Sequence, residues 1–262
     1  MHYIFFSIAF LASSIGAISG LGGGIIIKPL LDGMGHFDSL QINFLSGCTV
    51  LAMATISLIK SKYDGNLFLG RNDLTLALSG CVGGILGKLL LDFITQAILG
   101  NDSVLLLQSY ILILINAGMI IYLKIKAKIV PANITNKIAC VITGVFLGGL
   151  SSFLGIGGGA MNIGILCAFF SMTTKQAAES SLFIIFCAQL FSLLTSISTS
   201  TVPPFSIEVL SLMLGGGILG ALAGNRARRQ MSGHAVEKML SLLLLALICL
   251  SIYNIFIFKG YL

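Results

Sequence analysis

Ten apolar segments occupy almost the whole chain and leave only short polar connections between them. Because a helix needs about 20 apolar residues to cross the hydrocarbon core of a bilayer, segments of this kind are typical of membrane spans. We therefore expect an all-α integral membrane protein without a sizeable domain outside the bilayer. The segments cover residues 2–19, 22–35, 40–59, 74–99, 104–123, 135–153, 157–172, 177–198, 206–224 and 236–258.

The composition excludes most other classes of protein. Of the 262 residues, 56% are hydrophobic and only 9% are charged, whereas a soluble domain carries about a quarter charged residues. This excludes an ordinary cytosolic enzyme, a disordered chain and a nucleic-acid-binding protein. The six cysteines form no C-x-x-C pair, and no cluster of His, Cys or carboxylates indicates an enzyme. We therefore expect no catalytic residue, no metal and no cofactor.

The chain contains an internal repeat, which appears when residue n is compared with residue n + 135. The motif G-x-G-G-G occurs at 20–24 and again at 155–159, and Gly83–Gly87 matches Gly216–Gly220 with a slip of two residues. We predict two repeats of about five helical segments each. The predicted units are residues 1–124, a basic cytoplasmic linker at 125–134, and residues 135–262.

Lysine and arginine are concentrated in some connections and scarce in others. Because positively charged loops stay in the cytoplasm, this bias predicts the orientation of the chain. It places both termini outside the inner membrane and turns the two repeats upside down relative to each other, as is typical of secondary transporters. Most of the net charge of +6 then lies in the cytoplasmic connections and indicates the orientation of the chain in the membrane. The basic connections are 60–71, 124–137 and 226–238, and the poor ones are 32–38, 100–103 and 199–205.

Each glycine cluster lies between an apolar segment and an unusually short one. Since each glycine costs a helix roughly 1 kcal/mol relative to alanine, we predict broken or re-entrant short helices there. The helix after such a break directs its free N–H groups and the positive end of its dipole toward the gap. We expect the two breaks to meet near the midplane and to form an anion site. The alternative is that the glycines only allow close helix packing.

A few polar side chains lie where they would face this site. Hydroxyl groups occur near the start of the third segment of each repeat, and Asn162 lies three residues after the second glycine cluster. Lys28 is the one cation in a short apolar segment; it either supplies counter-charge for an oxyanion or extends to the interface. The candidate substrate-binding residues are Gly20, Gly22, Gly23, Gly24, Lys28, Ser46, Gly155, Gly157, Gly158, Gly159, Asn162, Ser180 and Ser181.

Other polar residues have simpler expected roles. Gln41 and Gln176, which the repeat pairs, either cap the carbonyl groups exposed at the breaks or contact the substrate. Glu179 follows Lys175 by one helical turn, so an ordinary i,i+4 ion pair is expected, with a proton-coupling carboxylate as the alternative.

Several of these motifs together resemble the TauE/SafE family of sulfite and organosulfonate exporters. They are the glycine motif followed by Pro29 and Leu30, its second copy, the Ser-Ser-Leu sequence at 180–182, and the two Gly-Gly-Ile-Leu-Gly elements. The resemblance implies an inner-membrane permease that exports small sulfur-containing oxyanions, and the architecture favours alternating access. A permease for another small anion or a metal ion, and a non-transporting assembly protein, are the alternatives. Proton coupling and potential-driven uniport both stay open, and the sequence does not indicate an oligomeric state.

Overall fold

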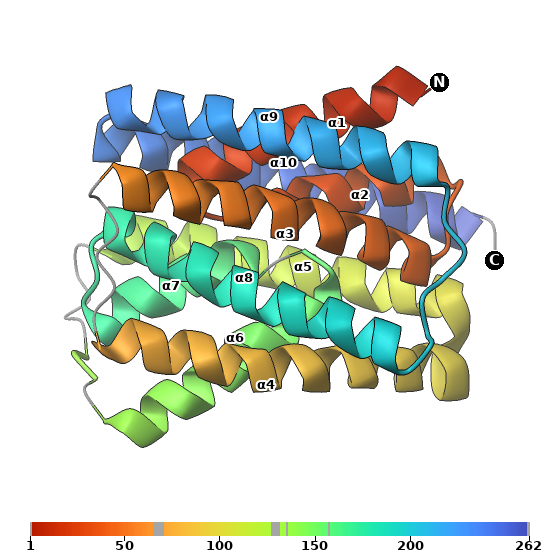
Figure 1. Cartoon of the computed structure of the whole chain (residues 1–262), viewed down its shortest axis with the longest axis horizontal. Coiled ribbons are helices and arrows are strands. Elements are labelled where there is room, and N and C mark those ends of the chain that lie inside the picture. Colours follow the sequence, from red (N-terminus) through yellow and green to blue (C-terminus); the bar gives the residue numbers. More distant parts are fainter. Residues whose placement is uncertain (1, 65–70, 127–131, 135, 157, 261–262) are drawn as a thin grey trace.

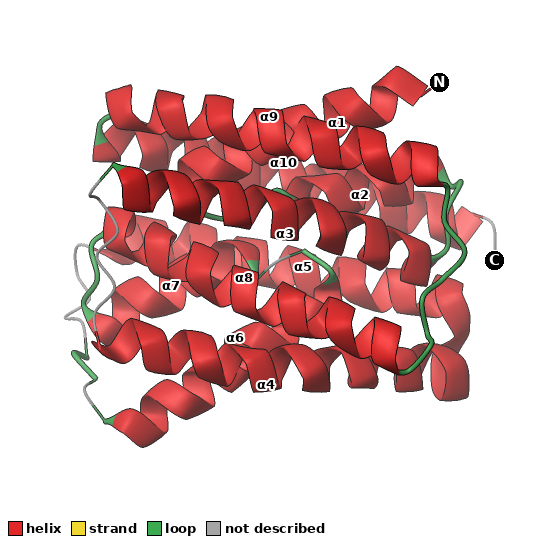
Figure 2. Cartoon of the chain, viewed as in Figure 1, coloured by secondary structure: helices red, strands yellow, loops and turns green. Residues whose placement is uncertain are grey.

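The computed structural model describes residues 2–64, 71–126, 132–134, 136–156 and 158–260, and this part of the chain is helical without any strand (Figure 2). Seven of its helices are long and apolar enough to cross a membrane, which confirms the predicted all-helical membrane fold. The elements are α1 His2–Ser19, α2 Gly24–Met34, α3 Ser39–Tyr63, α4 Arg71–Phe93, the π-helix η1 Ile94–Leu99, α5 Gly100–Ile125, α6 Lys137–Leu154, α7 Gly159–Phe170, α8 Thr174–Ser198, α9 Ile207–Gln230 and α10 Gly233–Gly260.

The bounds of several helices in the two parts of the chain are related by a shift of 135 residues. Shifting α1 by 135 residues gives 137–154, which are the bounds of α6, and shifting α3 gives 174–198, which are the bounds of α8. The remaining pairs agree within a few residues. The two parts of the chain therefore have the same order of α-helices, and the π-helix η1 has no counterpart among the described residues of the second part.

The two parts are interlocked in space. Helix α1 packs against α9, and its counterpart α6 packs against α4, so the first helix of each part contacts the fourth helix of the other. The counterparts α3 and α8 lie against each other in the middle of a row formed by α9, α3, α8 and α4 (Figure 1). They run antiparallel, since the start of each lines a pocket with the end of the other.

The repeated Gly-Gly-Ile-Leu-Gly elements explain how these pairs come so close. A Cβ atom at Gly216 would lie 2.5 Å from the carbonyl oxygen of Phe6 in α1, and one at Gly83 would collide with the carbonyl oxygen of Val145 in α6. Small residues at an interface let helix backbones approach closely in a membrane. These glycines therefore serve close helix packing.

The short helices α2 and α7 return toward the end of the molecule from which the preceding helix began. The rings of Phe5, near the start of α1, and Phe37, after α2, lie 5.7 Å apart. Likewise, Ala132 before α6 donates a backbone hydrogen bond to Ala168 near the end of α7. Helices of 11 and 12 residues span about 16–18 Å, roughly half of the hydrocarbon core. Thus α1–α2 and α6–α7 are hairpins with a short second helix, and the predicted broken helices are confirmed.

Basic residues gather at one end of the bundle, which we call the basic end. Lys60, Lys175, Arg228 and Arg229 line one pocket there. The start of α1, the end of α10 and the α8–α9 connection lie at the opposite end (Figure 1). Asp32, which was expected in a connection poor in basic residues, belongs instead to α2 and is only 2% exposed.

Candidate anion site at the helix breaks

Both glycine motifs interrupt the helix, as predicted. The first break separates α1 from α2, and Gly20 and Gly22 there have φ angles of 74° and 79°. The second break separates α6 from α7, and Gly155 and Gly158 have φ angles of 63° and 84°. Residues with side chains rarely adopt these left-handed conformations. The repeated motif therefore encodes a turn of the backbone, and Gly157 lies outside the described residues.

The two breaks contact each other in the interior. A Cβ atom at Gly24 would lie 2.8 Å from the backbone of Ile156, and one at Gly159 would lie 2.7 Å from the side chain of Ile25. The glycines thus permit an approach that side chains would prevent. Gly23, by contrast, packs within its own hairpin, since its nearest neighbour is Ser13 at 3.1 Å.

Each break also lies against the long central helix of the other part. Gly20 packs on Ala178 of α8, and Gly155 packs on Asn43 of α3. These two neighbours are equivalent in the repeat, since 43 + 135 = 178. The same position therefore presents a methyl group to the first break and an amide to the second.

Unpartnered polar groups gather around the second break. The amide nitrogen of Asn162 lies 2.5 Å from where a Cβ atom of Gly158 would be, and the hydroxyl of Ser151 faces the same position. Both side chains are 0% exposed and have no hydrogen-bond partner among the described residues. The Nδ2 atom of Asn43 is unpartnered as well. Because an unsatisfied buried polar group costs about 1–3 kcal/mol, such a cluster suits a bound polar ligand.

Lys28 lies beside this cluster. It is fully buried, and its Nζ donates to Asn43 Oδ1 at 2.8 Å and to Gln108 Oε1. Gln108 in turn donates to the carbonyl of Phe153, in the last turn of α6, at 2.6 Å. A cation is favoured near a helix C-terminus. The alternative in which Lys28 extends to the membrane interface is therefore wrong, and its charge is fixed next to the second break.

The three predicted serines have different surroundings. Ser46 donates to the carbonyl of Gly155 at 2.9 Å and so stabilises the second break directly. Ser180 donates instead to Asp73 of α4 at 2.9 Å, and its hydroxyl proton is committed to that carboxylate. Ser181 is buried without a partner, three residues after Ala178 and hence on the face of α8 that meets the first break.

The paired glutamines cap helices rather than the breaks. Gln41 accepts a hydrogen bond from the backbone N–H of Asp38, and Gln176 accepts one from that of Thr173, each at 3.0 Å. These contacts complete capping boxes at the starts of α3 and α8. The expectation that they bond to the carbonyls of the breaks is wrong, because the free N-termini of their own helices lie closer.

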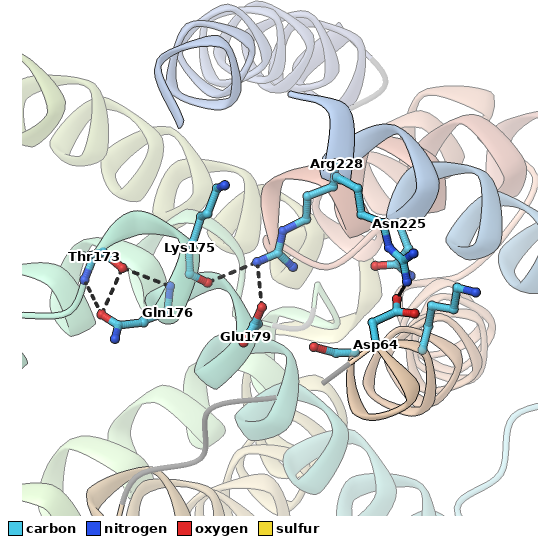
Figure 3. A pocket seen from close by; sticks show the side chains of 10 residues that line it. Asp64, Thr173, Lys175, Gln176, Glu179, Asn225 and Arg228 are labelled. Atoms are coloured by element: carbon cyan, nitrogen blue, oxygen red, sulfur yellow. Dashed lines mark hydrogen bonds and ion pairs between the residues drawn. The ribbon is translucent and has the colours of Figure 1, made fainter. Parts of the chain in front are cut away.

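Two pockets lie along the α3–α8 interface, one at each end. The larger, at the basic end, has a volume of about 620 Å³ and is shown in Figure 3. The smaller, at the opposite end, has a volume of about 20 Å³ and is lined by Asn43, Ser152 and Gln189 among others; it is large enough for about one water molecule. The first break lies next to the larger pocket, since Ala178 precedes the pocket residue Glu179, and the second lies next to the smaller. The glycines of the breaks line neither pocket.

Three residues of this region belong to none of the sequence motifs described above. Asn43, Gln108 and Ser151 belong to α3, α5 and α6. The sequence could have indicated them only in a general way, because an amide or hydroxyl within an apolar membrane segment needs a partner or a function. That requirement does not say which of many such residues lie together.

The fold defines a multi-pass membrane protein with two helix hairpins whose breaks contact each other in the interior. A family model described as "Sulfite exporter TauE/SafE" matches residues 5–251. The chain therefore belongs to the TauE/SafE family, whose members are membrane transporters and not enzymes. No curated protein and no solved structure matches the chain.

Proposed function

We propose that this chain is a secondary transporter that exports small sulfur-containing oxyanions, such as sulfite or organosulfonates, across the inner membrane. Membership in the TauE/SafE family supports this class of solute. The observation that carries the proposal is the cluster of buried, unpartnered groups of Asn43, Ser151 and Asn162 at the second break. Amide and hydroxyl donors bind a pyramidal or tetrahedral oxyanion through several hydrogen bonds at once.

The helix that follows the second break adds to this site. Helix α7 begins at Gly159, and its first N–H groups have no partner within the helix. They direct the positive end of the helix dipole toward the break, where an anion is stabilised. Lys28 lies nearby, held by Asn43 and Gln108, with the buried carboxyl group of Asp32 one helical turn further along α2. The anion thus binds to dipoles and hydrogen-bond donors, with one lysine as counter-charge.

Transport follows from alternating access between the two ends of the α3–α8 interface. In this conformation the pocket at the basic end is wide and that at the opposite end is narrow. Residues 1–124 and 135–262 act as inverted repeats, joined by the cytoplasmic linker 125–134. Exchange of their conformations closes the wide pocket and opens the narrow one. The basic end faces the cytoplasm and both termini lie outside.

The experiment is transport by the purified full chain in liposomes. Release of labelled sulfite is measured in competition with sulfate, sulfoacetate, chloride and divalent cations, with and without a pH gradient. Competition by sulfur oxyanions, but not by cations, is the expected result. Dependence on the pH gradient would indicate proton coupling, and dependence on membrane potential alone would indicate uniport. Liposomes that move no labelled anion, or that move a metal ion instead, would refute the proposal.

Lys28→Met tests the site within that assay. The substitution keeps a long buried side chain and removes the charge next to the second break, so the sulfite concentration for half-maximal transport should rise about tenfold. Lys62→Gln is the control, because Lys62 is an exposed lysine of α3 outside the break region. If the two variants are both folded in thermal unfolding and need the same sulfite concentration for half-maximal transport, Lys28 does not belong to the site.

A further inference from the structure

The pocket at the basic end, which we call the basic pocket, carries an excess of positive charge. Its volume of about 620 Å³ is much larger than sulfite requires and falls in the range of small-molecule sites. Four basic residues and two acidic residues line it, and each of the two acidic residues contacts an arginine of α9. The pocket is lined by Lys60, Ser61, Asp64, Thr173, Lys175, Gln176, Glu179, Asn225, Arg228 and Arg229 (Figure 3).

The two arginines of α9 are engaged to different degrees. Arg229 forms an ion pair with Asp64 of α3 and so ties these helices together. Arg228 reaches the start of α8, where its guanidinium donates to the carbonyl of Lys175 at 3.0 Å and contacts Glu179 at 3.4 Å (Figure 3). A charge-assisted hydrogen bond is normally about 2.7–2.9 Å long. Glu179 therefore holds Arg228 loosely, through one long contact.

Most of the hydrogen-bonding capacity of Arg228 is left for a ligand. A guanidinium carries five N–H donors in a planar fork that matches an oxyanion, and only one of its nitrogens contacts Glu179 and the carbonyl of Lys175. Its side chain is 13% exposed, so the group is largely shielded from water while it lines the pocket. An anion reaching it would meet a charge that solvent screens weakly.

The position of this arginine links it to the helix breaks. Glu179, its partner, directly follows Ala178, on which Gly20 of the first break packs. An anion bound to Arg228 would therefore lie on the side of the basic pocket that is next to the first break.

We propose that the basic pocket is a second oxyanion site, at which the anion replaces Glu179 on Arg228 before it moves to the breaks. The proposal rests on the proposed transport function. It adds a binding site that the anion occupies before it reaches the candidate site at the second break. Lys60 and Lys175 attract the anion, and Arg228 binds it. The volume of the pocket accommodates an organosulfonate with its carbon chain as well as sulfite, so the larger substrates gain most from this site.

Two substitutions with opposite expected effects test this role. Arg228→Gln removes the binding group and should weaken sulfite binding about tenfold. Glu179→Gln removes the competing carboxylate and should strengthen it about threefold. If the ion pair serves only to hold α8 and α9 together, both substitutions should instead impair the protein in the same direction. Lys62→Gln is the charge control, because Lys62 lies at the same end of α3 but does not line the pocket.

Binding can be measured separately from transport because the chain has no tryptophan. Ser61→Trp places a single indole in the basic pocket of the otherwise intact chain. Iodide, an anionic quencher, should quench it more strongly than neutral acrylamide does, and added sulfite should suppress the iodide effect. The suppression should require about tenfold more sulfite in the Arg228→Gln background and less in the Glu179→Gln background.

The outcomes separate this proposal from the transport function. Sulfite that competes with iodide without being transported would uphold the second site and overturn the proposed function. Transport with identical sulfite dependence in Arg228→Gln, Glu179→Gln and Lys62→Gln would overturn the second site alone. If Arg228→Gln does not fold, Glu179→Gln decides, because weaker or unchanged sulfite binding in that variant contradicts the proposal.

Discussion

The two helix breaks share one motif and equivalent positions, yet their surroundings differ in chemistry. At the first break the counterpart of Asn162 is the buried Ile27, and Gly20 packs on a methyl group. At the second break, two amides and the Ser151 hydroxyl lack partners. The motif thus provides the same turn twice, while the flanking side chains place unpartnered amides beside the second turn and only hydroxyls, those of Ser13 and Ser181, beside the first. A duplicated backbone element can therefore be specialised by a few substitutions next to it.

The largest expected difference between the breaks is in their tolerance of a methyl group. Gly158→Ala forces a side chain into a left-handed conformation, at about 1–2 kcal/mol, and into contact with Ser151 and Asn162, so we expect sulfite transport to fall about 100-fold or more. Gly23→Ala should retain most activity, because Gly23 has a φ of −65° and its nearest neighbour is at 3.1 Å. Labelled-sulfite efflux at equal membrane expression measures both, and equal losses would contradict the comparison.

A smaller but more specific effect is expected when the second break is made to resemble the first. Asn162→Leu replaces an unpartnered buried amide by an apolar group of similar size, so the thermal unfolding temperature should rise. Sulfite transport should nevertheless fall about tenfold or more, since the ligand loses a donor. Sulfite should also no longer stabilise the variant against heat, whereas it should stabilise the unmodified chain.

Ile27→Leu is the matched control for that substitution. It changes the equivalent position of the first break and keeps volume and polarity, so it should cost less than about 1.5 kcal/mol and leave transport nearly unchanged. An Asn162→Leu variant that transports as well as Ile27→Leu would mean that the two breaks do not differ in function.

The smallest expected effect compares the capping boxes of α3 and α8. Gln41→Ala removes the capping contact with Asp38, and Gln176→Ala removes the contacts with the backbone N–H and the hydroxyl of Thr173; we expect each substitution to cost about 0.5–1 kcal/mol of stability. The loss should be larger for Gln41, because its Nε2 also donates to the carbonyl of Pro204 in the α8–α9 connection at 2.8 Å. Thermal unfolding in detergent measures the difference, and transport should be retained in both variants. A larger loss for Gln176 would show that the Pro204 contact adds nothing.

The apolar pattern predicts the helices and the glycine motifs predict the breaks, because both depend on local sequence. The partners of the buried polar groups could not be predicted in this way. Lys28, Asn43 and Gln108 come from three helices whose lateral packing no periodicity specifies. Similarly, Ser180 lies at the predicted level of the bundle but faces α4 rather than the breaks. Position along a membrane helix is thus readable from sequence, whereas rotation about its axis depends on tertiary contacts.

The interlocked packing of α1 on α9 has a consequence for how the chain is made. Helix α1 ends at Ser19 and α9 begins at Ile207, so the 187 residues from 20 to 206 separate the two helices along the chain. At about 5–20 residues per second, the ribosome takes roughly 10–40 s to synthesise that stretch. During this time the surface of α1 that will receive the glycines of α9 faces lipid or an insertion chaperone. The contact between α1 and α9 therefore forms only after about four-fifths of the chain has been synthesised.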